Sequence, residues 1–144
     1  MFSQPVKSVM ERKKLLIAPP GMTVSEAAKQ MAKNKVGAVL IVDKESLIGI
    51  FTERDAVFRV MAQGRDLNAT CLADVMTPQP KTVDPGKSFG YALLLMHENG
   101  FRHVPVVEKG KLVGIVSARN ALDPDLEEFA AEAHRRDHIR REGN

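Results

Sequence analysis

Two segments of the chain carry apolar residues at positions i, i+3, i+4 and i+7, the spacing that places side chains on one face of an α-helix. They are Val24, Ala27, Ala28 and Met31 in the first segment, and Phe89, Ala92, Leu93 and Met96 in the second. Each segment follows a Pro-Gly turn and begins after a residue that caps helices, Thr23 or Ser88. Thr23 and Glu26 also predict a reciprocal capping box. The pattern therefore predicts two amphipathic helices, each with one buried face.

Short apolar runs separated by polar residues follow both helices, which is the pattern of a β-hairpin. The predicted strands are 38–42 with 47–51, and 103–107 with 112–116. Because apolar residues are continuous rather than alternating in 39–42, we expect these strands to be covered on both faces. The remaining expected elements are short helical segments at 6–10 and 72–76, strands at 15–18 and 81–83, and helices that start at Thr52 and Ser117.

The two sets of elements form an internal repeat, since residues 31–55 align with residues 96–120 without a gap. One repeat alone, at about 60 residues, would bury only about 60% of its unfolded surface, so the two repeats should fold against each other. We expect an α/β (α+β) fold of two β-α-β-β-α repeats with pseudo-twofold symmetry. The repeats are expected at 1–66 and 67–124, and a C-terminal helix with a basic tail at 125–144. Such a molecule tends to bind ligands between its halves.

The composition is that of a soluble globular protein, with 44% hydrophobic and 27% charged residues. The formal net charge is +3, and the excess of basic residues lies mainly at the two ends of the chain. The single cysteine, Cys71, excludes an intramolecular disulfide and fits a reducing compartment. The chain carries neither an apolar run close to about 18 residues nor a signal-peptide core, so we expect a cytoplasmic protein that does not enter a membrane.

Three kinds of chemistry find little support in the sequence. No nucleophile, base and orienting group come together, so we expect a protein that is not an enzyme and requires no cofactor. His134 and His138 are spaced i, i+4 on the last helix, but Arg135 interrupts the H-E-x-x-H zinc motif, which favours a solvated helix face over a metal site. The sequence argues against nucleic-acid binding, because the chain has no tryptophan and only one tyrosine to stack on bases.

Four motifs carry a resemblance to a known family. They are Asp74-Val-Met-Thr77, Arg102-His-Val-Pro-Val-Val107, Leu-x-Gly-Ile at 47–50 and 112–115, and Thr52-x-x-Asp55. Over roughly residues 5–122 the chain resembles the tandem cystathionine β-synthase (CBS) domain pair. The resemblance implies a regulatory module whose clefts between the repeats hold an adenosine compound: AMP, ADP, ATP, S-adenosylmethionine or NAD. It also implies a disc-like antiparallel homodimer. Because almost the whole chain is module, the effect of the ligand would pass to a separate protein partner or to the oligomer itself.

The resemblance and the chemistry of the side chains assign roles around Thr52-x-x-Asp55. Asp55 can accept two ribose hydroxyls, Thr52 can hydrogen-bond the ligand, and Arg54 can donate two hydrogen bonds to phosphate, which a helix N-terminus also favours. The resemblance implies that the cleft is completed by the leading segment of the other repeat and by the start of a strand. Those residues here are Val75, Met76, Thr77 and Pro78, and Gly37 and Ala38.

The second copy differs in charge at the matching positions, which hold Ser117, Arg119 and Asn120. Asparagine can hydrogen-bond a ribose, but without a charge. Arg102 and His103 stand at a strand start where members of the family often contact phosphate, whereas the first copy has glycine and alanine there. We therefore expect ribose recognition at Asp55, and a second cleft that is either empty or binds phosphate more than sugar.

Each assignment has a structural alternative. Thr52 and Asp55 also match a capping box, which stabilises a helix by about 1 kcal/mol without any ligand. Arg102 and His103 can be ordinary surface residues on a strand edge. The competing function is therefore a scaffold or partner-binding CBS pair whose clefts bind nothing, and its support is Asn120 together with the small residues Gly37 and Ala38.

Overall fold

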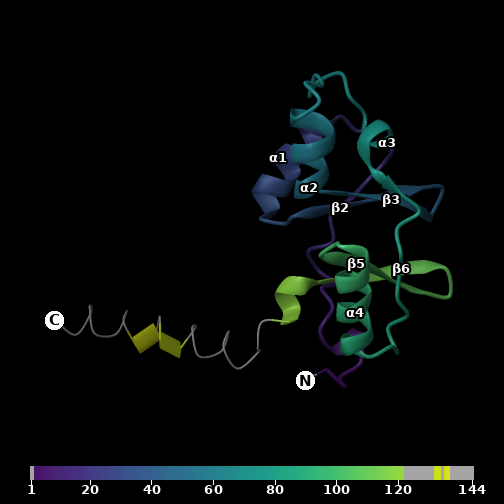
Figure 1. Ribbon diagram of the computed structural model, residues 1–144, viewed down its shortest axis with the longest axis vertical. Helices are drawn as coiled ribbons and strands as arrows, with labels where there is room; N and C mark the ends of the chain where they lie inside the picture. The colour runs from purple at the N-terminus through teal and green to yellow at the C-terminus, as the bar shows by residue number, and fades with distance from the viewer. Residues whose placement is uncertain (1, 122–131, 134, 137–144) are drawn as a thin grey trace.

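The computed structural model describes residues 2–121, 132–133 and 135–136, and it has two lobes stacked along the long axis (Figure 1). Each lobe is built around one of the predicted hairpins, with a helix packed against it. The expected mixed α/β fold of two repeats is confirmed. Leu126, Phe129 and Ala130 of the expected C-terminal helix lie outside the described residues, as do His134 and His138.

The elements follow the predicted order. The first lobe contains β1 (Ile17–Ala18), α1 (Val24–Asn34), β2 (Ala38–Asp43), β3 (Ser46–Thr52) and α2 (Glu53–Asp55), which continues as the π-helical stretch η2 (Ala56–Met61). The second lobe contains α4 (Phe89–Asn99), β5 (His103–Glu108), β6 (Lys111–Ser117) and the 3-10 helix η3 (Ala118–Ala121). The remaining short elements are η1 (Val6–Ser8), α3 (Leu72–Val75) and β4 (Thr77–Pro78). The four hairpin strands agree with the prediction to within one residue at each end.

The sheet of the first lobe has the strand order β1-β2-β3-β4, in which β1 and β2 are parallel and the other pairs are antiparallel. The second lobe has the β5-β6 hairpin, and the strand expected at 81–83 is reduced to one parallel bridge between Val83 and Val106. Pro80 and Pro85 flank that segment, and proline has no N–H to continue a ladder. The expected strand was therefore wrong in extent.

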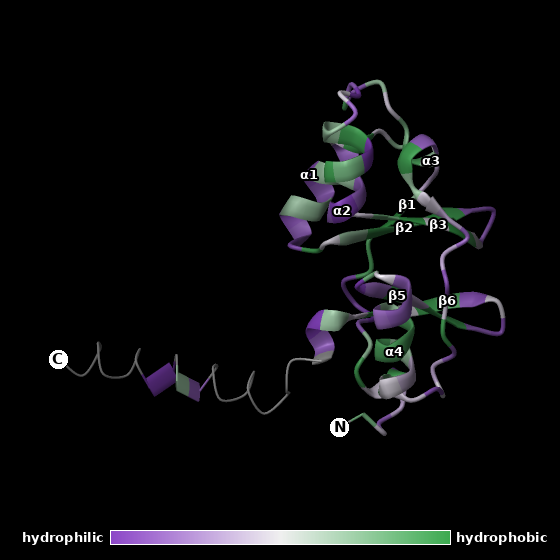
Figure 2. Cartoon of the chain, in the orientation of Figure 1, coloured by the Kyte–Doolittle hydropathy of each residue, from purple (hydrophilic) through white to green (hydrophobic). Residues whose placement is uncertain are grey.

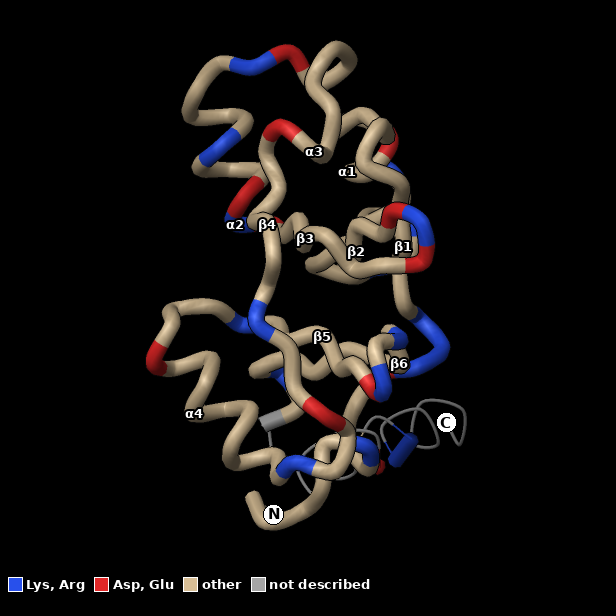
Figure 3. The backbone as a smooth tube through the Cα atoms, turned by 90° about the vertical axis from the view of Figure 1, so that its right-hand side faces the viewer, with Lys and Arg blue, Asp and Glu red and all other residues tan. Residues whose placement is uncertain are grey.

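Each lobe is completed by a segment that precedes the other repeat in the sequence. η1 packs on the second lobe, where the Val6 backbone N–H donates to the Lys87 carbonyl at 2.7 Å and the Val6 side chain is fully buried. α3 and β4 join the first lobe, where Leu72 enters the core and Gly49 pairs with Pro78. We call residues 5–11 and 72–78 the exchanged segments. Figure 3 shows the two passages of chain that connect the lobes on opposite sides.

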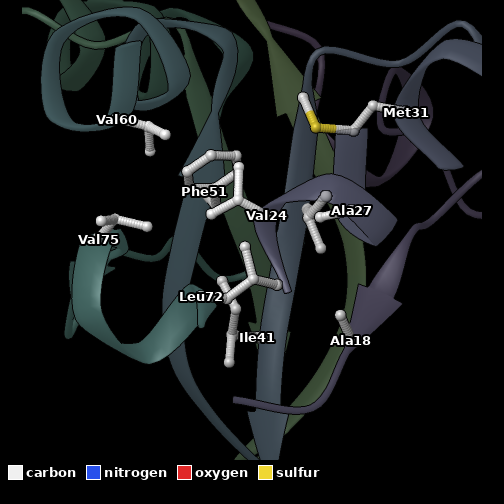
Figure 4. Packing of buried hydrophobic residues seen from close by; sticks show 10 residues of the cluster. Ala18, Val24, Ala27, Met31, Ile41, Phe51, Val60, Leu72 and Val75 are labelled. Carbon is white, nitrogen blue, oxygen red and sulfur yellow. The ribbon is translucent and has the colours of Figure 1, made fainter. Parts of the chain in front are cut away.

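The core of the first lobe gathers side chains from five elements around Phe51 (Figure 4). Val24 and Ala27 come from α1, Ile41 from β2, Val60 from η2, and the remaining large side chains come from the exchanged segment, namely Leu72 and Val75. Phe51 and Leu72 are fully buried. The first lobe therefore depends on residues that lie on the far side of η2 in the sequence.

A separate apolar cluster, which we call the seam, joins the two lobes. Its buried members are Ala38, Leu40 and Ile50, and its partly buried members are Leu15, Leu47, Leu112 and Ile115. Since successive residues of a strand point to opposite faces, β2 directs Val39 and Ile41 into the lobe core and the alternate residues into the seam. The prediction of strands covered on both faces is confirmed, and Figure 2 shows the hydrophobic strands ending in hydrophilic hairpin turns.

The predicted N-caps of the two long helices are present. Thr23 Oγ1 accepts from the Glu26 backbone N–H at 3.2 Å, and Ser88 Oγ accepts from that of Tyr91 at 3.1 Å. The reciprocal capping box expected at Thr23 was wrong, because the Glu26 carboxylate accepts instead from Gln30 Nε2 at 3.2 Å, one turn further along the helix. Within the described part of the chain, none of the helices has the length and apolar character needed to cross a membrane.

The glycines of the two Leu-x-Gly-Ile motifs make room for methionines of the exchanged segments. An ideal Cβ at Gly49 would overlap Met76 Sδ and lie 2.9 Å from its Cγ. An ideal Cβ at Gly114 would lie 2.7 Å from Met10 Sδ and 3.0 Å from the Glu11 carbonyl oxygen. Close approach of a strand to an exchanged segment therefore requires glycine in both lobes.

Substitution of Gly49 by alanine should destabilise the fold, because Met76 would have to move away from β3. Overpacking of this kind lowers the free energy of unfolding by about 1–3 kcal/mol, which urea denaturation followed by circular dichroism would measure. Gly21→Ala is the matched control, since an ideal Cβ at Gly21 meets no atom within 4 Å. Equal losses of stability in the two variants would contradict this account of Gly49.

Candidate functional site

The start of α2 places Asp55 at the boundary between the lobes. Thr52 is the N-cap residue, and its Oγ1 accepts from the Asp55 backbone N–H at 3.4 Å. In return the Thr52 backbone N–H donates to Asp55 Oδ2 at 2.9 Å. The capping box that the sequence allowed here is therefore complete, and Asp55 is only 7% exposed.

The other carboxylate oxygen of Asp55 contacts residues from two further elements. Asp55 Oδ1 accepts from Thr77 Oγ1 of the exchanged segment at 3.3 Å and lies 3.4 Å from Arg59 Nε. Arg59 Nη1 also donates to the Met76 carbonyl at 2.8 Å. The structure thus brings together Thr52, Asp55, Met76 and Thr77, as the sequence predicted for the first cleft.

Arg59 was missed by the sequence analysis. The available signal was the i, i+4 spacing of Asp55 and Arg59, which brings an acidic and a basic side chain together on a helix. Arg59 lies in η2, a π-helical stretch. Such stretches are rare in proteins, and those that occur are often found at functional sites. Half of the Arg59 side chain is exposed, so its ion pair contributes little to stability and leaves the arginine free to exchange partners.

Gly37 and Ala38 lie directly beside the start of α2. The Glu53 backbone N–H donates to the Gly37 carbonyl at 3.1 Å, and Ala38 pairs with Thr52 across the hairpin. An ideal Cβ at Gly37 would lie 2.8 Å from Glu53 Oε1. The predicted strand-start residues, Gly37 and Ala38, therefore lie in the same group as the start of α2, the helix that carries Asp55.

Arg54 reaches across the lobe boundary. Its Nη1 donates to the carbonyl of Gly100 in the second lobe at 2.9 Å, and its guanidinium lies 5.4 Å from the centre of the Phe58 ring. Arg54 was expected to bind a phosphate group. In this structure the guanidinium binds a backbone carbonyl and joins the two lobes.

His103 lies on the second-lobe side of the same boundary. Burial lowers the pKa of the His103 imidazole below its ordinary value, the Glu53 carboxylate raises that pKa, and the Arg102 guanidinium lowers it. Glu53 from the first lobe and Arg102 from the second therefore both exert their charge on one histidine.

The second copy repeats the backbone geometry with different chemistry. The Ser117 backbone N–H donates to Asn120 Oδ1 at 2.8 Å, and the Ala118 N–H donates to the Arg102 carbonyl at 2.8 Å. These bonds match those of Thr52 with Asp55 and of Glu53 with Gly37 in the first copy. Arg119 is exposed. The group around Asn120 is thus a neutral counterpart of the group around Asp55.

Two residues of the predicted leading segment lie differently from the rest. Val75 is 2% exposed and belongs to the core of the first lobe with Phe51, so its side chain is not part of the group around Asp55. Pro78 is exposed and pairs with Gly49 at the sheet edge.

The exchanged segment that serves the second copy was not among the predicted site residues. Glu11 bridges Ile115, just as Thr77 pairs with Ile50 in the first copy. The Glu11 carboxylate accepts from the backbone N–H groups of Lys13 and Lys14 at 3.2 and 2.9 Å. Alignment of 6–10 with 72–76 was the signal that would have placed these residues. Within the described residues, no group of three or more His, Cys, Asp or Glu side chains is placed to hold a metal ion.

Comparisons with known proteins agree with this arrangement. The family model described as the CBS domain matches residues 6–62 and 72–125. A mitochondrial CBS domain-containing protein of Arabidopsis thaliana is 35% identical over 118 residues, which cover 78% of this chain and 57% of that protein. The chain therefore spans little more than half the length of that relative.

Two solved structures share the fold. A conserved protein from Pyrococcus horikoshii has a TM-score of 0.79 at 29% identity, covering 85% of this chain and 92% of the other. A CBS domain protein from Pyrobaculum aerophilum complexed with AMP has a TM-score of 0.76 at 28% identity, covering 89% of this chain and 99% of the other. With two CBS matches along its length and two lobes of the corresponding fold, the chain belongs to the CBS domain family as a tandem pair of repeats.

Proposed function

We propose that this CBS pair is a regulatory protein that binds an adenosyl compound between its lobes, with the ribose on Asp55, and passes the occupancy on to a partner. The observation that carries the proposal is the Asp55 carboxylate, which is 7% exposed and lies where the hairpin, α2 and the exchanged segment meet. The AMP complex of the Pyrobaculum aerophilum protein supports the same class of ligand.

The two carboxylate oxygens suit a ribose diol unequally. Oδ2 accepts a short bond of 2.9 Å from the Thr52 N–H, whereas Oδ1 has only the longer contacts of 3.3 and 3.4 Å to Thr77 and Arg59. Hydroxyl donors approach a carboxylate to about 2.5–2.7 Å, and charge-assisted bonds are the stronger kind. Ribose hydroxyls would therefore replace the weaker contacts at Oδ1 and leave the helix cap in place.

The seam offers apolar surface for the base. Ala38 and Ile50 of the first lobe belong to the seam at the end of the hairpin that leads to Thr52, and Ile115 of the second lobe is partly buried against this cluster. An adenine ring is planar, and its faces pack well against aliphatic side chains. Ribose on Asp55 and base on the seam would place the ligand in contact with both lobes.

Release of Arg59 from Asp55 would transmit ligand binding to η2 on the protein surface. When ribose takes Oδ1, the arginine loses one of its two anchors and keeps only the Met76 carbonyl. η2, which carries Arg59, also exposes Phe58 and Met61 to 58% and 60%. A ligand shifts a conformational equilibrium only through unequal affinity for its states, and exchange of the Arg59 contact supplies that inequality.

A homodimer through the exposed helical faces completes the proposal. Large apolar side chains are exposed on η2 and on α4, where Tyr91 and Leu94 are 46% and 55% exposed. α2 and α4 lie along one side of the molecule (Figure 3). Large apolar side chains exposed on one side of a molecule are typical of an interaction surface.

The second candidate is a CBS pair that binds no ligand and acts as a scaffold. The observation in its favour is that Asp55 is already satisfied by the protein, as one half of a complete capping box. In that case the carboxylate would serve the stability of α2 alone.

Thermal denaturation with adenosine, AMP, ADP, ATP, NAD and S-adenosylmethionine separates the two candidates. At about 100 times its dissociation constant, a ligand that binds only the folded state should stabilise the protein by about 2.7 kcal/mol and raise its melting temperature. If none of the compounds moves the melting temperature at millimolar concentration, the scaffold is the better account.

Asp55→Asn should weaken AMP binding about tenfold or more, because an amide keeps one acceptor for the Thr52 N–H but loses the charge that holds the ribose hydroxyls. Binding of 2′-deoxy-AMP should change much less, since it lacks one of those hydroxyls. Calorimetry with both nucleotides measures the difference. Asn120→Ala is the control in the second copy, and an equal loss of AMP affinity there would refute the unequal roles of the two copies.

Met61→Asp should shift the protein from dimer to monomer in analytical ultracentrifugation, because it places a charge in the proposed apolar contact. Leu67→Asp is the control, since Leu67 is also exposed, at 42%, but lies in the connection after η2. A monomeric parent protein, or a dimer unaffected by Met61→Asp, would rule out this surface.

A further inference from the structure

The two copies carry opposite charges at equivalent places beside the lobe boundary. Glu53 donates its backbone N–H to the Gly37 carbonyl, and Ala118 donates to the Arg102 carbonyl, so these two pairs match each other. In the first copy the helix residue is acidic and the strand residue has no side chain. In the second copy the helix residue is alanine and the strand residue is an arginine. The two pairs therefore have the same backbone hydrogen bond, but the first carries a negative charge and the second a positive charge.

The space at Gly37 is filled by the Glu53 carboxylate. An ideal Cβ at Gly37 would lie 2.8 Å from Glu53 Oε1 and 3.1 Å from its Cδ. A larger residue at position 37 would have to displace the carboxylate. Gly37 was expected in the ligand site because of its position at the strand start. Its lack of a side chain leaves the space that the Glu53 carboxylate occupies.

The Glu53 carboxylate acts across the lobe boundary on His103, a residue of the second copy that was expected to contact phosphate. Glu53 raises the pKa of His103, so its charge reaches the start of β5 in the opposite lobe. Arg54, which was expected to bind phosphate, instead binds the Gly100 carbonyl, and Arg59 is engaged by Asp55 and the Met76 carbonyl. The start of α2 thus presents two carboxylates, Glu53 and Asp55, while Arg54 and Arg59 of the same helix already have partners. Arg102 acts on His103 from the opposite lobe.

We propose that Glu53 is a specificity-determining residue that disfavours phosphate next to the Asp55 ribose site, so that the site selects adenosyl compounds with a neutral or cationic 5′ group over nucleoside polyphosphates. This inference rests on the proposed adenosyl function. The physical basis is the repulsion between the Glu53 carboxylate and each phosphate charge, which grows along the series adenosine, AMP and ATP. Adenosine and S-adenosylmethionine, which carries a positive sulfonium at that position, meet no such repulsion.

Glu53→Gln tests the inference, because it removes the charge and keeps the size and the backbone contacts. At low ionic strength the parent protein should bind adenosine more tightly than ATP, and the substitution should raise ATP affinity about tenfold while leaving adenosine affinity unchanged. The gain should shrink in salt, which screens charges beyond a Debye length of about 10 Å at 0.1 M. Glu45→Gln is the matched control, since Glu45 lies at the turn of the same hairpin, at the end away from α2.

The possible outcomes distinguish a failure of the Glu53 inference from a failure of the proposed adenosyl-binding function. If adenosine binds but Glu53→Gln leaves the ratio of adenosine to ATP affinity unchanged, Glu53 is not the selecting residue and the proposed function stands. If adenosine, AMP and S-adenosylmethionine all fail to bind the parent protein, the proposed function fails and this inference fails with it.

A measurement without ligand checks the position of Glu53. Removal of the carboxylate takes away the influence that raises the pKa of His103, so NMR titration should find a lower His103 pKa in Glu53→Gln than in the parent protein. His103→Gln identifies the resonance among the histidines. An unchanged pKa would place the carboxylate away from the lobe boundary and overturn the inference.

Discussion

The pairing of each hairpin with the exchanged segment that precedes the other repeat in the sequence determines the rest of this structure. β3 pairs with β4 through Ile50 and Thr77, and β6 pairs with the N-terminal segment through Ile115 and Glu11. Both contacts bring a methionine over a glycine, and both deliver core residues that the lobe lacks. The same pairing delivers Thr77 to Asp55, so the stability of the lobe and the composition of the site have a common origin.

Local features of the sequence predicted most of the fold. The helical spacing around Val24 and Phe89 and the apolar runs of the hairpins are decided by residues close together in the chain, and both are confirmed. The strand expected at 81–83 is reduced to one bridge, because the prolines that flank it have no N–H to extend the pairing. The capping box at Thr23 failed because Glu26 had a competing partner one turn away, which a pattern of residue types does not reveal.

The candidate site was predictable only in part, because its members come from segments far apart in the sequence. The repeat pointed to Thr52, Asp55 and the segment around Thr77, which the structure brings together. No pattern of residues predicted that Arg54 would bind a carbonyl of the opposite lobe, or that Glu53 would fill the space at Gly37. The Arg54 contact depends on how the lobes are docked at the seam, and the Glu53 contact depends on how its side chain lies over Gly37 within the first lobe. Neither is decided by a local pattern of residue types.

The exchanged segments also impose an order on the formation of the two lobes during synthesis. The first lobe lacks Leu72 and Val75 until the chain has passed residue 78, so it cannot close when its own repeat ends. The second lobe must recruit Val6, which has left the ribosome long before Phe89 is made. Val6 therefore has no buried position until the second lobe has been made, and we expect its docking there to be a late step that ties the two repeats together.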